Sequence, residues 1–106
     1  MLQTLKDALA TTKLPFAHYA WAKNAKERLG DHGVYAEDGA NDLYGDDIHV
    51  EKAIEGTVDY YTRDDSGAPQ KTIEAALNNG EIAWYLNSIQ IEEDTGFIHY
   101  EWVFQV

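Results

Sequence analysis

The end of the chain constrains the fold most strongly, because two stretches that alternate apolar and polar residues flank a short turn. The stretches are 82–92 and 97–106, and the turn is Glu93-Asp94-Thr95-Gly96. A period of two is typical of strands with one buried face, and a glycine at the end of the turn favours a hairpin. Pairing Glu92 with Phe97 predicts a continuous apolar face on which a helix can pack. Its members are Ala83, Tyr85, Ile89, Ile91, Ile98, Tyr100, Trp102, Phe104 and Val106. Asn87 interrupts this face opposite Trp102.

A second alternating stretch, 48–62, predicts a long strand. Gly56 lies on its apolar face and indicates a bulge or the close approach of a neighbouring backbone. Residues 33–37 predict a shorter strand, and the aromatic segment 16–21 predicts a strand or an extended arm. The acidic stretch 38–47 is rich in turn residues and is expected to be a loop.

Two segments have helical patterns. Residues 1–12 space their leucines by three and four positions, and Pro15 ends this segment. The second helix begins at Pro69 and ends with Gly80 as a left-handed cap. Residues 22–32 are polar and could be a loop or a helical turn. The order predicts one α+β domain over the whole chain, with both helices on one face of an antiparallel-rich sheet and a C-terminal β-hairpin.

Composition narrows the function classes. The chain has 19 acidic and 8 basic residues, a formal net charge of −11, which argues against binding to nucleic-acid phosphates. It has no cysteine, so a disulfide framework and a thiolate metal site are excluded. No apolar run approaches the roughly 20 residues needed to cross a bilayer, and no signal-peptide pattern opens the chain. We therefore expect a soluble domain made in a reducing compartment.

Histidine and carboxylate pairs are the candidates for a metal or acid–base site. His49 and Glu51 share one predicted strand face, and His99 and Glu101 share another. Either pair could supply two ligands, but the spacings of zinc proteases and of calcium-binding loops are absent. Neither serine lies in a nucleophile elbow, and no glycine-rich phosphate-binding motif is present. The sequence predicts no enzyme activity and no cofactor.

The charge is unevenly spread along the chain. Residues 1–30 carry a net charge of +3, residues 31–65 carry −9 and residues 66–106 carry −5. Unlike charges at two ends of one small domain suit head-to-tail contacts between copies, and plain solvation is the alternative explanation.

The chain resembles a family of short proteins from the tail-gene clusters of long-tailed phages and prophages. The likeness is carried by VYAEDGANDLYGDD at 34–47, EGTVDYYTRDD at 55–65, ALNNGEIAW at 76–84 and NSIQIEEDTGFIHYEWVFQV at 87–106. The leucine-bearing helix and the Leu-Pro-aromatic step that follows it, within 5–16, also match. The likeness covers nearly the whole chain, and its motifs are not catalytic. The family is that of the tail terminators, also called tail completion or tail-to-head joining proteins.

The resemblance implies a small α+β domain that closes as a ring, usually a hexamer, on the finished tail tube. Such a ring stops polymerisation of the major tail tube protein and offers a surface to the head–tail connector. DNA passes through the ring without being bound, and neither a membrane, a cofactor nor a catalytic residue is involved. The protein would be made in the cytoplasm of the bacterial host and would end at the head-proximal end of the tail in the virion.

Three sets of residues are the candidates for contacts in such an assembly. Apolar residues within the acidic stretch are expected to dock a partner: Tyr35, Leu43 and Tyr44. Basic residues are expected to contact an acidic neighbour: Lys23, Lys26 and Arg28. Acidic residues are expected in a mobile loop near the lumen or the tube-facing surface: Glu37, Asp38, Asp42, Asp46 and Asp47. There they would repel DNA within a Debye length of ~8 Å, and a plain solvent-facing loop is the alternative.

Two other functions are weighed against this one. An acidic phage protein could mimic DNA and occupy the basic groove of a host nuclease or regulator, and residues 31–106 carry a net charge of −14 for that purpose. A metal-dependent hydrolase would instead need a tight divalent-ion site near His49 or His99.

Overall fold

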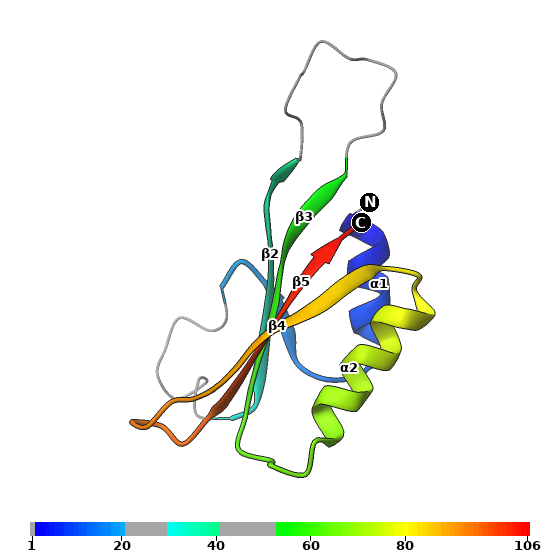
Figure 1. Ribbon diagram of the computed structural model, residues 1–106. Helices are drawn as coiled ribbons and strands as arrows, with labels where there is room; N and C mark the ends of the chain where they lie inside the picture. The colour runs from blue at the N-terminus through cyan, green and yellow to red at the C-terminus, as the bar shows by residue number, and fades with distance from the viewer. Residues whose placement is uncertain (1, 21–29, 41–52) are drawn as a thin grey trace, which may run out of the picture.

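The computed structural model describes residues 2–20, 30–40 and 53–106 and forms one five-stranded sheet with two helices on one face (Figure 1). The elements in chain order are α1 (Leu2–Thr11), β1 (Phe16–His18), β2 (His32–Ala40), β3 (Ile54–Thr62), α2 (Ala68–Asn79), β4 (Ala83–Ile91) and β5 (Ile98–Gln105). The strand order is β1-β2-β3-β5-β4, and only the β1–β2 pair is parallel. The predicted α+β class is confirmed, with the hairpin at the C-terminal end.

The core lies between the sheet and the helices. α1 buries Leu5 and Leu9, and α2 buries Ile73 and Leu77 against the sheet. Trp102 on β5 is fully buried in this layer, and its Nε1 donates a hydrogen bond of 2.9 Å to Oε2 of Glu74 on α2. The indole therefore joins the central sheet to the helix by both packing and a hydrogen bond.

The backbone of β2 comes very close to Gly56 on β3. A Cβ atom added at Gly56 would overlap the carbonyl oxygen of Ala36 and lie 2.7 Å from Cα of Glu37. The β2–β3 register also shifts between Glu37 and Gly39, opposite this glycine. The prediction that Gly56 marks a bulge or a close backbone approach is confirmed, and both occur together.

The hairpin register holds near the turn and changes at Asn87. Ile91 pairs with Ile98 and Ile89 with Tyr100, as predicted, but the register shifts between Leu86 and Ser88. The extra residue, Asn87, forms a bulge and donates a hydrogen bond of 2.8 Å to Glu101. From Leu86 back to Ala83, every β4 side chain therefore lies on the face opposite to the predicted one. The predicted placement of Ala83 and Tyr85 on the helix-covered face is therefore wrong, because Trp84 and Leu86 take those places opposite Phe104 and Trp102.

Two other expectations require correction. Residues 38–40 continue β2, so the expected loop does not begin at Asp38. Gly80 has φ −81°, so it is not a left-handed cap; Glu81 has the positive φ, 57°. A Cβ at Gly80 would lie 3.1 Å from Cβ of Ala8, so α1 packs closely against the end of α2 at this glycine.

Candidate interaction surface

The sheet face opposite the helices carries a stack of three rings from three strands. The ring of Tyr61 on β3 lies between His99 on β5, at 4.2 Å, and His32 on β2, at 4.7 Å. Phe97 meets His32 edge to face, and the Arg63 guanidinium lies 4.0 Å from the centroid of the Phe97 ring. These contacts fix the side chains of the face at its hairpin end.

Carboxylates surround His99 in this stack. Its Nε2 lies 2.8 Å from Oδ1 of Asp59, and its Nδ1 lies 4.0 Å from Oε1 of Glu92. The hydrogen bond to Asp59 raises the pKa of His99, burial opposes this rise, and the charges of Asp59, Glu92 and Glu101 add to it. Burial and the same three carboxylates raise the pKa of Tyr61 to about 12. The cluster therefore favours a charged imidazole.

The structure does not join the predicted pair of His99 and Glu101 into a metal site. His99 binds Asp59, whereas Glu101 accepts the hydrogen bond from Asn87. In the parts of the chain that are described, no group of three or more histidine, aspartate or glutamate side chains is arranged to hold a metal ion. The other predicted pair, His49 and Glu51, lies outside the described residues.

A second ring cluster lies at the β1 edge of the sheet. The imidazole of His18 stacks on Tyr19 at 4.1 Å and on Tyr35 at 4.7 Å, and its Nε2 lies 2.8 Å from Oε1 of Glu37. A hydrogen bond from Tyr19 lowers the pKa of Glu37, burial opposes this change, and the hydrogen bond and charge of His18 add to the lowering. Glu37 is thus a structural partner on a strand, and its expected place in a loop is corrected.

Tyr35 is a core residue. Its side chain is only 6% exposed, because β1 and α1 cover it, and this burial corrects its expected role as a docking residue. Asp38 is exposed but lies on β2 rather than in a loop. The remaining predicted contact residues lie outside the described ranges: Lys23, Lys26, Arg28, Asp42, Leu43, Tyr44, Asp46 and Asp47.

The outer strand β4 presents the most distinctive surface of the described structure. Four large apolar side chains are exposed among the described residues, and three of them lie on β4: Tyr85 at 58%, Ile89 at 51% and Ile91 at 71%. Ala83–Ile91 contains no charged residue and no proline, in a chain of which 25% is charged. Edge strands usually carry lysine, proline or inward-pointing charges that prevent pairing with other chains. β4 carries a bulge alone, and no other strand within residues 2–20, 30–40 and 53–106 pairs with its outer edge.

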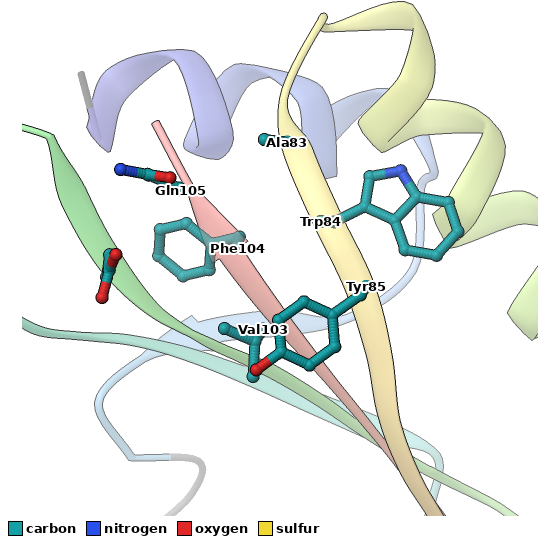
Figure 2. A pocket seen from close by; sticks show the side chains of 7 residues that line it. Ala83, Trp84, Tyr85, Val103, Phe104 and Gln105 are labelled. Carbon is teal, nitrogen blue, oxygen red and sulfur yellow. The ribbon is translucent and has the colours of Figure 1, made fainter.

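A groove lies beside the first half of β4. Figure 2 shows Tyr85 and Val103 next to one another on the open face, while Trp84 points to the α2 side. The Trp84 Nε1 donates a hydrogen bond of 2.8 Å to Asn78, which fixes the indole against the end of α2. The groove has a volume of about 260 Å³ and is lined by Glu55, Ala83, Trp84, Tyr85, Val103, Phe104 and Gln105.

Sequence reasoning missed this surface because it assigned Tyr85, Ile89 and Ile91 to a helix-covered face. The signal was nevertheless present: residues 82–91 lack charge, although they belong to a strongly acidic chain. No family model matches the chain, and no curated protein matches its sequence. Neither α1 nor α2 is long and apolar enough to cross a membrane.

Proposed function

We propose that this protein is a phage tail terminator, which caps the finished tail tube as a ring and forms the joining surface for the head–tail connector. The observation that carries the proposal is the open edge of β4, an uncharged apolar strip on an acidic domain. A surface of this kind suits contacts with other proteins, and the resemblance to tail completion proteins indicates which assembly they serve.

The uneven spread of charge along the chain favours a head-to-tail arrangement of copies in the ring. Residues 1–30 carry +3 and the remainder carries −14, so unlike surfaces can meet between neighbouring copies. An acidic ring would also let DNA pass without binding it, because carboxylates repel phosphates at short range.

The test is a prophage from which this gene is deleted. We expect tail tubes of uncontrolled length and heads without tails in electron micrographs, and restoration of both by the chain supplied from a plasmid. Antibody against the chain should label one end of the tube. Tails of normal length that join heads in the deletion strain would contradict the proposal.

The alternative function is mimicry of DNA, and it draws on the net charge. A mimic needs carboxylates that are free to meet a basic groove, whereas Asp59 and Glu101 on the open face accept hydrogen bonds from His99 and Asn87. A protein that ignores tail-tube subunits yet competes with DNA for a host nuclease would favour the mimic over the terminator.

A further inference from the structure

We propose that the β4 edge binds an extended segment of another protein, apolar at alternate positions and carrying lysine or arginine at both ends. This segment would add to the sheet as a sixth strand. The inference rests on the proposed assembly role of this edge and specifies the chemistry of the partner.

The backbone of β4 is oriented to accept such a strand. The N–H of Glu92 donates to the carbonyl oxygen of Phe97 at 2.8 Å, so the backbone polar groups of Glu92 point to β5. Inward-facing and outward-facing residues alternate along an antiparallel strand, so Gln90 also faces β5. Ile89 and Ile91 therefore turn their N–H and C=O groups to the free edge, where an added strand can pair with them.

The side chains beside this edge favour apolar residues in the partner. Ile89 and Ile91 lie on the helix side of the sheet but are exposed, because this half of β4 runs beyond α2 (Figure 1). Tyr85 lies on the opposite face, next to the groove that includes Val103. A strand with apolar side chains at alternate positions would cover Ile89 and Ile91 on the helix side, and its other face would meet Tyr85.

The charges around β4 decide between a basic partner and a second copy. Residues 81–106 contain five acidic residues and no lysine or arginine. Glu81 precedes β4, while Glu92, Glu93 and Asp94 follow it, so carboxylates bracket the uncharged strip at both ends. A second copy of β4 would bring the same carboxylates together. The β1 edge of a second copy has only three residues and is too short to match β4.

The probe is a synthetic peptide that alternates valine and threonine over the length of β4 and carries paired lysines at each end. Its control has paired glutamates in place of the lysines. Fluorescence anisotropy with the full chain should show the lysine peptide binding about tenfold more tightly, with an affinity that falls as salt increases. Equal binding of both peptides, or of neither, would overturn the proposal.

Two variants with the same change in charge locate the binding. Ile89→Lys with Ile91→Lys alters the edge, and Thr72→Lys with Ala75→Lys alters the exposed side of α2. The first variant should lose the peptide, and the second should keep it. Hydrogen exchange of the wild type gives an independent reading, because the amides of Ile89 and Ile91 should slow when the peptide is present. Protection confined to other strands would contradict the assignment.

Sedimentation of the wild type tests the remaining alternative, in which a second copy of the chain covers the β4 edge. A dimer that forms without peptide and is abolished by the edge variant would show that a second copy covers β4, and this result would overturn the proposal of a basic partner. A protein that caps tails but does not distinguish the two peptides would refute this inference alone. Selective peptide binding by a protein absent from tails would refute the proposed function instead.

Discussion

His99 and Asp59 are diagonal neighbours in the β3–β5 ladder, with 2.8 Å between Nε2 and Oδ1, on the sheet face that no described helix covers. Both side chains are about four-fifths buried, and Tyr61 stacks on the imidazole. The pair therefore forms in a partly desolvated place, where a charge-assisted hydrogen bond stabilises more than it does in open water.

This pair should make stability depend on pH. The pKa of His99 is raised in the folded state by its hydrogen bond to Asp59, so the stabilisation is fully present below the ordinary value of 6.5. It is lost as pH rises through the raised pKa. We expect Asp59→Asn to lower the free energy of unfolding by about 1 kcal/mol near pH 5.5, with a difference that falls toward zero near pH 8.5.

Urea unfolding of both proteins at several pH values measures this difference. Glu93→Gln is the control, because it removes one exposed carboxylate from the hairpin turn without touching the imidazole. A cost of Asp59→Asn that stays constant from acid to alkaline pH would show that the charge of His99 does not contribute.

Gly56 is expected to tolerate no side chain. An alanine Cβ there would overlap the Ala36 carbonyl oxygen, which belongs to a paired strand and cannot move alone. We expect Gly56→Ala to destabilise the fold by about 3 kcal/mol. Gly30→Ala is the matched control, since a Cβ at Gly30 meets no atom within 4 Å. Equal decreases in the melting temperatures of Gly56→Ala and Gly30→Ala would argue against the close approach.

Trp102 should be the side chain whose loss costs most. It is fully buried and its indole donates to Glu74, so Trp102→Ala removes a large apolar volume and one of the two hydrogen bonds that Oε2 of the partly buried Glu74 accepts. We expect a loss of about 3–5 kcal/mol by denaturant unfolding. Tyr85→Ala removes another ring of the same hairpin but one that is 58% exposed, and it should change stability by less than about 0.5 kcal/mol. Similar costs for the two variants would place Trp102 outside the core.

Local patterns predicted the elements, whereas contacts between distant segments decided what the sequence left open. Alternation correctly placed Val58 and Tyr60 on a buried face, because that pattern needs only the period of one strand. The burial of Tyr35 depends on β1 and α1 reaching it from an earlier part of the chain.

The candidate surface was harder to predict for the same reason. The exposure of Tyr85 depends on a single bulge residue, and the exposure of Ile91 depends on how far α2 extends over the sheet. Neither exposure can be predicted from the hydrophobic period within residues 83–91.

Asn87 should protect the β4 edge from uncontrolled pairing. Its removal would leave Leu86 next to Ser88, and their partners on β5, Trp102 and Glu101, are already consecutive. Deleting Asn87 should therefore keep the fold, make the ladder continuous and flatten the edge. Since long, flat, uncharged edges pair with other chains, we expect the deletion to aggregate at concentrations where the wild type does not. Light scattering measures this, with Asn87→Ala as the control, because it keeps the bulge and loses only the hydrogen bond to Glu101. If Asn87→Ala aggregates as much as the deletion, the side chain rather than the bulge provides the protection.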